Sequence, residues 1–98
     1  MFIHSVYFWL REDLTDEQRA AFAEGVRSLT TIEGVKAGFV GTPADTDRPV
    51  IDRSYSYGLV LDLDDRQGHD AYQTHPTHQA FVERFKSFWS KVQIYDFE

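Results

Sequence analysis

The stretch Tyr72-Gln73-Thr74-His75-Pro76-Thr77-His78-Gln79-Ala80-Phe81 sets one proline between two histidines. Proline suits the first turn of a helix, and it disfavours helical geometry in the residue that precedes it. We therefore expect one short helix to end near Gln73 and a second helix to begin at Pro76. Histidine has the side-chain pKa that lies nearest to neutrality, so this helix start is also where chemistry is expected first.

The helix that begins at Pro76 carries an apolar stripe in line with His78. Counted from His78, large apolar residues follow at offsets of 3, 4, 7 and 11, namely Phe81, Val82, Phe85 and Trp89. This spacing predicts a helix that continues through Phe88 and Trp89, with His78 on its inward face. Burial and the positive end of the helix dipole both disfavour the imidazolium form. We expect a neutral imidazole that can accept a proton as a general base.

The segments before this break predict a strand followed by a helix. Phe2 to Leu10 alternates as a strand, and both of its faces carry large apolar groups. Thr15 and Gln18 form a capping box for a helix that runs to about Thr30. Its apolar stripe consists of Phe22, Val26 and Leu29.

The rest of the chain predicts three more strands and completes an α+β pattern. The expected strands are Val35 to Thr42, Tyr55 to Leu63 and Val92 to Phe97, with a long loop over 42–53 and a short helix over 66–73. The order β-α-β-β-α-β, with its second helix broken, is that of the ferredoxin-like fold with a four-stranded antiparallel sheet. Helices on one face leave Ile3, Tyr7 and Trp9 uncovered on the other. We expect a second copy to cover that face, giving a homodimer with a shared barrel.

The composition indicates one globular domain over residues 1–98 and excludes several classes of partner. The chain is 42% hydrophobic and 15% aromatic, and its net charge of -6 argues against nucleic acid. It has no cysteine, so disulfides and thiolate metal sites are excluded. No segment has the length of a membrane span, and the N-terminus does not resemble a signal peptide, so we expect a cytoplasmic protein without membrane partners.

Further polar side chains are expected around His78. His4 shares the strand face of Val6 and Phe8, Tyr72 ends the short helix, and Asp96 shares a strand face with Val92 and Ile94. Together they form a candidate set in an aromatic-walled cavity, with His78 and Tyr72 as the catalytic residues. The expected supporting and lining residues are His4, Asp96, Val6, Phe8, Phe22, Val26, Tyr57, Leu59, Phe81 and Trp89. The alternative for each histidine is a hydrogen-bonded residue of the core.

Metal and cofactor sites are not expected from the sequence. His75 and His78 stand three residues apart and could chelate with His4, but His75 is expected to point away and to shape the helix start. His69 lies between Gly68 and Asp70, where we expect it to be solvated. The glycines match neither nucleotide-binding fingerprint.

These residues resemble a known family. His4-x-Val6-x-Phe8, together with Tyr72-x-x-His75-Pro76-x-His78-x-x-Phe81, is similar to the stress-responsive A/B barrel (Dabb) domain, and the likeness spans essentially the whole chain. It implies a dimeric α+β barrel. Some plant members are cofactor-independent polyketide cyclases that use a tyrosine and a histidine, which correspond by motif to Tyr72 and His78. The chain departs from those cyclases at Tyr57, where they carry histidine, and at Gly25-Val26, where they carry tyrosine.

Three functions follow as hypotheses. The first is a cofactor-independent, lyase-like enzyme that acts on a small hydrophobic carbonyl or aromatic compound. The second is a non-catalytic, stress-related dimer that binds a small ligand or none. The third, taken from related dimeric barrels, is a monooxygenase-type or haem-binding protein.

Overall fold

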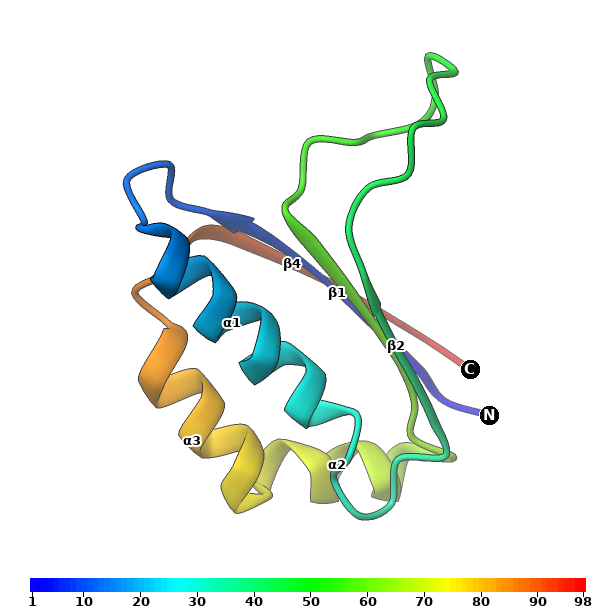
Figure 1. Ribbon diagram of the computed structural model, residues 1–98. Coiled ribbons are helices and arrows are strands. Elements are labelled where there is room, and N and C mark those ends of the chain that lie inside the picture. Colours follow the sequence, from blue (N-terminus) through cyan, green and yellow to red (C-terminus); the bar gives the residue numbers. More distant parts are fainter.

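The computed structural model describes all residues 1–98 and shows a sheet with helices on one side (Figure 1). The elements follow the order β1 (Ile3–Leu10), α1 (Asp16–Leu29), β2 (Ala37–Gly41), β3 (Tyr57–Asp62), α2 (Arg66–Thr74), α3 (Pro76–Phe85) and β4 (Trp89–Phe97). The four strands pair antiparallel in the order β2-β3-β1-β4. The ferredoxin-like arrangement expected from the sequence, with its second helix broken at the proline, is confirmed.

Local sequence accounts for where the helices begin. The Thr15 side chain accepts from the backbone N–H of Gln18, and the Gln18 side chain accepts in return from the backbone N–H of Thr15, which is the predicted capping box. At the second break, His75 has extended backbone geometry, and its Nδ1 accepts from the N–H of Thr77 at 3.1 Å. His75 therefore caps α3 as expected, and its Nδ1 is occupied by this hydrogen bond.

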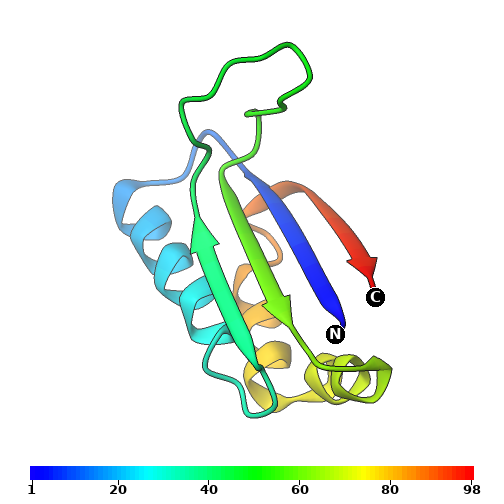
Figure 2. The ribbon, with the colours of Figure 1, turned by 90° about the vertical axis from the view of Figure 1, so that its right-hand side faces the viewer.

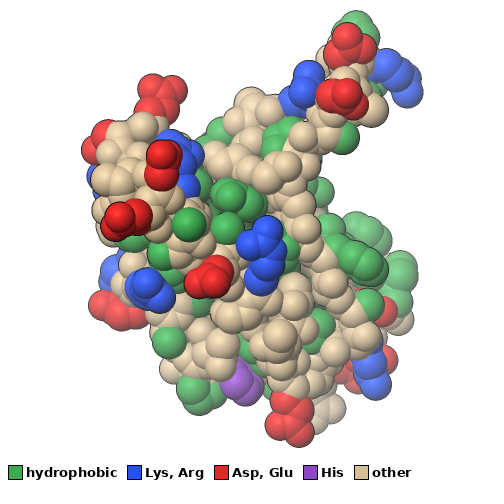
Figure 3. All heavy atoms as spheres, in the orientation of Figure 1, with side chains coloured by type: hydrophobic (Ala, Val, Ile, Leu, Met, Phe, Trp, Pro, Cys, Tyr) green, Lys and Arg blue, Asp and Glu red, His purple; other side chains and the backbone are tan.

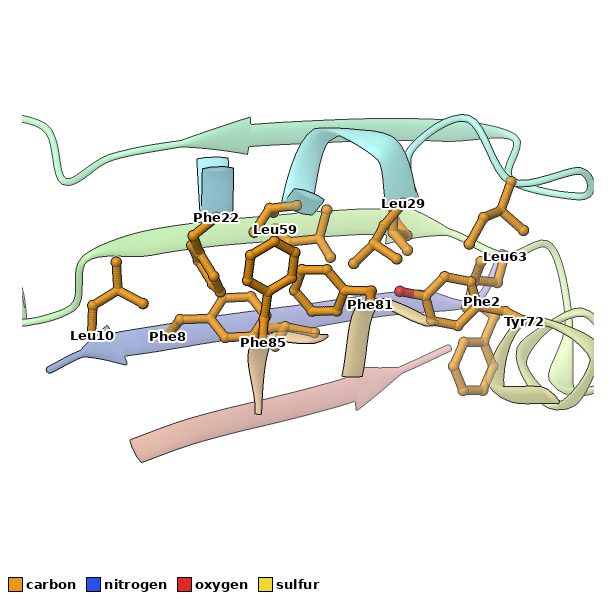
Figure 4. Packing of buried hydrophobic residues seen from close by; sticks show 14 of the residues in the cluster. Phe2, Phe8, Leu10, Phe22, Leu29, Leu59, Leu63, Tyr72, Phe81 and Phe85 are labelled. Carbon is orange, nitrogen blue, oxygen red and sulfur yellow. The ribbon is translucent and has the colours of Figure 1, made fainter. Parts of the chain in front are cut away.

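The core lies between the sheet and α1 and α3 (Figure 4). Phe22, Val26 and Leu29 of α1 are fully buried, and Phe81 and Phe85 of α3 meet them from the neighbouring helix. The ring of Phe22 packs within 6.4 Å, centroid to centroid, of five aromatic rings, which belong to Phe8, Tyr57, Phe81, Phe85 and Trp89. The predicted apolar stripe of α1 is thus the centre of the core.

The end of α3 differs from the sequence prediction. The helix stops at Phe85, and Trp89 is the first residue of β4, so the expected continuation through Phe88 and Trp89 was wrong. The pairing of β1 with β4 changes register between Trp9 and Leu10, which is a bulge that turns the Trp89 ring toward the helices. Trp89 consequently stacks on Phe81 at a centroid distance of 6.1 Å, although it stands on a strand.

The other strands are shorter than expected, because β2 covers only Ala37–Gly41 and β3 only Tyr57–Asp62. The chain between them projects away from the body of the domain (Figure 2). None of the helices combines the length and the hydropathy needed to cross a bilayer.

One face of the sheet has no helix on it (Figure 2). Phe39, Tyr95 and Phe97 project from that face and are 71%, 59% and 53% exposed. Hydrophobic side chains gather along the margin of the molecule where this face lies (Figure 3). The two-faced alternation of the first strand therefore corresponds to a sheet with one covered and one open apolar face.

Candidate active site

An apolar cavity of about 320 Å³ opens between the sheet and the junction of α2 with α3. Its lining residues are His4, Val6, Phe8, Leu29, Leu59, Tyr72, Gln73, His78, Phe81, Val82, Trp89, Val92 and Ile94. Val92 and Ile94 of the edge strand β4 are partly exposed, so the cavity reaches the surface beside that strand. Its volume and apolar lining suit a small hydrophobic ligand.

Tyr72 and His78 face each other across the break between α2 and α3. Their ring centroids are 4.7 Å apart, and both residues line the cavity. Tyr72 is in the last turn of α2 and His78 is in the first turn of α3. The helix break at Pro76 therefore brings the two rings together. The inward direction predicted for His78 is confirmed.

The His78 imidazole is held in a form that can accept a proton. Its Nδ1 lies 3.1 Å from the backbone carbonyl oxygen of Gln73, an acceptor, so Nδ1 carries the hydrogen and the lone pair is on Nε2. Burial lowers the pKa of His78, and the nearby His4 and His69 lower it further, while the Gln73 carbonyl opposes them. The neutral ring therefore persists to a lower pH than in a free histidine.

The Tyr72 hydroxyl is suited to donate a hydrogen bond. Tyr72 is buried, and its oxygen is directed toward Phe81 inside the molecule (Figure 4). Burial raises the pKa of Tyr72 well above its usual value of 10. The hydroxyl consequently stays protonated at neutral pH.

His4 and Asp96 form a pair beside these two residues. They lie directly opposite each other on β1 and β4, and His4 Nδ1 is 2.5 Å from Asp96 Oδ1. His4 is 2% exposed, and its ring meets the edge of the Tyr72 ring at a centroid distance of 5.6 Å. The predicted support of an imidazole by Asp96 is therefore present, and the imidazole is that of His4.

The structure changes part of the predicted lining. Phe22 and Val26 are completely buried in the core and do not reach the cavity, and Tyr57 packs against Phe22 beside it. Five further residues that were not predicted line the cavity, namely Leu29, Gln73, Val82, Val92 and Ile94. Val92 and Ile94 could have been found, because they share a strand face with Asp96, whose place at the site was predicted.

His69 is also placed differently from its prediction. Its side chain is only 18% exposed, and its ring lies 5.0 Å from that of Phe2 and 5.6 Å from that of His4. The polar neighbours Gly68 and Asp70 suggested a solvated histidine. His69 is nevertheless largely buried, because α2 packs against the N-terminal end of β1 and brings the ring onto Phe2 and His4.

A larger hollow of about 680 Å³ lies at the opposite end of the sheet, near Arg11 and Arg19. Its cations are engaged within the chain, since Arg11 pairs with Asp13 at 2.9 Å and Arg19 donates to the carbonyl of Arg11 at 2.8 Å. The apolar cavity, which brings the Tyr72 hydroxyl and the His78 imidazole to one wall, is therefore the better candidate active site.

The lowered pKa of His78 leads to a prediction for the isolated protein. We expect the imidazole signals of His78, followed by NMR during a pH titration, to change with a midpoint below 6.5. The direction follows because burial penalises the charged form, so more acid is needed to protonate the ring. The missing signal in a His78→Asn variant assigns the resonance, and a midpoint at or above 6.5 would contradict the half-buried, neutral imidazole.

The fold and the cavity define a class: a ferredoxin-like α+β domain whose sheet and broken second helix enclose a small apolar site. Residues 2–98 match the family described as Stress responsive A/B Barrel Domain, or Dabb. The chain belongs to this family, as the resemblance in its sequence indicated.

Solved structures show the same fold. A Dabb family protein with a ferredoxin-like fold from Mesorhizobium loti is 25% identical with a TM-score of 0.78, covering 99% of this chain and 94% of that one. A dimeric ferredoxin-like protein of unknown function from Thermobifida fusca is 24% identical with a TM-score of 0.78, covering 98% and 88%. The hydroxynitrile lyase from Passiflora edulis is 16% identical with a TM-score of 0.80, covering 98% and 90%. No curated protein matches the chain.

Proposed function

We propose that the chain binds a small hydrophobic carbonyl compound in the apolar cavity and catalyses a cofactor-independent reaction that begins with proton removal. The observation that carries the proposal is the pair of Tyr72 and His78, 4.7 Å apart at the wall of that cavity. Tyr72 keeps its hydroxyl proton and can act as the donor, and His78 keeps a free lone pair on Nε2 and can act as the base. General acid–base catalysis needs this division of roles.

The chemical step uses the two residues together. His78 Nε2 takes a proton from the carbon next to the carbonyl, and the electron pair of the broken C–H bond forms the C=C bond of an enolate. The π electrons of the carbonyl move to its oxygen, where the Tyr72 hydroxyl stabilises the negative charge by a hydrogen bond. The enolate carbon then attacks a second carbonyl group or regains a proton, and the imidazolium returns its proton to the product.

The remaining groups would keep this geometry in place. The carbonyl of Gln73 fixes the His78 ring, and Asp96 fixes His4, whose ring packs against Tyr72. The surrounding apolar side chains exclude water, which strengthens the hydrogen bond to the enolate oxygen. The fold of the Passiflora edulis hydroxynitrile lyase is similar. Cleavage of a cyanohydrin also needs a base, which removes the hydroxyl proton while the C–CN bond breaks and cyanide leaves with a proton, so an aromatic cyanohydrin is a second probe.

Proton exchange into an aromatic ketone tests the proposal without knowledge of the natural substrate. We expect the protein to speed deuterium uptake from D₂O into the methyl group of acetophenone, followed by ¹H NMR, above the rate in buffer. A Tyr72→Phe variant keeps the ring but loses the donor, and its rate should fall by about 100-fold. If neither acetophenone nor mandelonitrile reacts faster than in buffer, the non-catalytic ligand-binding hypothesis takes its place.

The open apolar face of the sheet supports a second part of the proposal, namely that the chain works as a homodimer. Phe39, Tyr95 and Phe97 share one face of the sheet with Tyr7 and Trp9, and a monomer would leave these apolar side chains in water. The similar Thermobifida fusca protein is described as dimeric. A second copy of the sheet would cover the face and close the barrel after which the family is named.

A further inference from the structure

Three metal-ligating side chains from distant parts of the sequence meet at one end of the sheet. They are His4 of β1, His69 of α2 and Asp96 of β4, and one ligand atom from each lies within 4.8 Å of the other two. Asp96 stands between the rings, with Oδ1 at 2.5 Å from His4 Nδ1 and Oδ2 at 3.8 Å from His69 Nε2. We call these three residues the His-His-Asp cluster.

We infer that the His-His-Asp cluster binds a divalent first-row transition metal ion. Two imidazole nitrogens and one carboxylate oxygen are a donor set that such ions accept while leaving coordination positions open to water or a ligand. Bonds of about 2.0–2.2 Å to one ion place neighbouring donors about 3 Å apart or slightly more. The observed separations of 2.5 and 3.8 Å lie on either side of that value, so small side-chain rotations bring the donors to it.

A second carboxylate orients one of the ligands as metal sites require. His69 Nδ1 is 3.0 Å from Asp70 Oδ1, an acceptor, so the ring hydrogen is on Nδ1 and the lone pair of Nε2 is directed toward Asp96. An outer carboxylate that fixes the tautomer and the direction of a ligating histidine is a regular part of metal sites. A metal ion between Nε2 of His69 and the Asp96 carboxylate would separate this lone pair from the negatively charged oxygen.

The surroundings hold the cluster in place and leave it accessible. His4 is buried, and His69 packs against the ring of Phe2, so both imidazoles have little freedom. The side chains of Asp96 and His69 are 37% and 18% exposed, which gives an ion a path from solvent. The chain carries a net charge of -6, which favours the approach of a cation.

The cluster shares His4 and Asp96 with the proposed carbonyl chemistry, in which they support Tyr72, but it does not use the two reacting residues. Tyr72 and His78 are not among its ligands, although the His4 ring contacts Tyr72 and lines the cavity. Metal binding and proton exchange can therefore be measured, and can fail, separately.

Calorimetric titration of the full chain with zinc chloride tests the inference. We expect saturable binding of one ion per chain, and Co²⁺ in its place should give visible absorption bands that zinc abolishes. His69→Asn should weaken zinc binding by at least tenfold, and Asp70→Asn, which removes only the outer carboxylate, by about tenfold to 100-fold. Circular dichroism confirms that both variants are folded.

Two further histidine variants separate the cluster from chance binding. His75→Asn and His78→Asn each remove an imidazole outside the cluster and should leave zinc affinity at the wild-type value. Equal affinity in the wild type and His69→Asn would overturn the inference, and so would loss of binding in His75→Asn. Absence of saturable binding in the wild type would overturn it directly.

Discussion

Replacement of His78 by asparagine is expected to lower the rate of deuterium exchange into acetophenone by 10²- to 10⁴-fold, a range typical for loss of a general base. Asparagine is chosen because its amide N–H can still donate to the Gln73 carbonyl, as His78 Nδ1 does at 3.1 Å. The variant therefore keeps the hydrogen bond to Gln73 and loses the imidazole ring with the Nε2 lone pair. The measurement is the exchange rate by ¹H NMR, with binding of the ketone followed in the same samples.

The neighbouring His75 provides the matched control for this variant. Its ring caps α3 through the N–H of Thr77, and asparagine is itself a favourable residue at that position. His75→Asn should keep both the helix and the exchange rate. If His78→Asn retains more than a tenth of the wild-type rate, the base is another group, and His4 is then the first to test.

A charge placed on the open face of the sheet is expected to dissociate the proposed homodimer. Phe39 is 71% exposed in the single chain and lies on the outer face of β2, so Phe39→Asp should leave the fold of each subunit unchanged. In the dimer the aspartate would be buried without a partner, which costs about 3–5 kcal/mol. That cost corresponds to an increase in the dimer dissociation constant of more than about 100-fold. Sedimentation velocity at several protein concentrations measures it.

Val50→Asp is the corresponding control, because it makes a similar change from an apolar residue to a carboxylate away from the sheet. Val50 is 79% exposed in the loop between β2 and β3. The wild type and Val50→Asp should sediment as dimers under conditions in which Phe39→Asp is a monomer. A monomeric wild type, or equal dissociation by both variants, would contradict pairing through the sheet.

The elements that could be predicted from the sequence are those whose signals are local. The Thr15 capping box fixes the start of α1, and Pro76 separates α2 from α3, because both act on the backbone within one helical turn. The same proline also predicts that Tyr72 and His78 lie close together, because it places them in the last turn of α2 and the first turn of α3. Strand alternation was enough to put His4, Val6 and Phe8 on the covered face.

The features that could not be predicted depend on contacts between distant segments. Trp89 continues the apolar spacing of α3, but the bulge against Leu10 in β1 places it on β4. His69 has polar neighbours in sequence, yet a Cβ atom at Gly68 would lie only 1.9 Å from the carbonyl oxygen of Leu63. Because Gly68 has no side chain, α2 can approach the end of β3 closely enough to bring His69 to Asp96. The sequence contains no periodic pattern from which this close packing could be predicted.

The break at His75 and Pro76 also bears on protein engineering. The interruption of the helix turns the Tyr72 hydroxyl and the His78 imidazole toward the same cavity, although the two residues are only six positions apart. The Gln73 carbonyl, which accepts from the His78 ring, lies in the same segment, Tyr72 to His78. The proposed catalytic pair thus lies within one short segment of the chain, so this segment can be transferred as a unit to another helical hairpin that borders an apolar cavity.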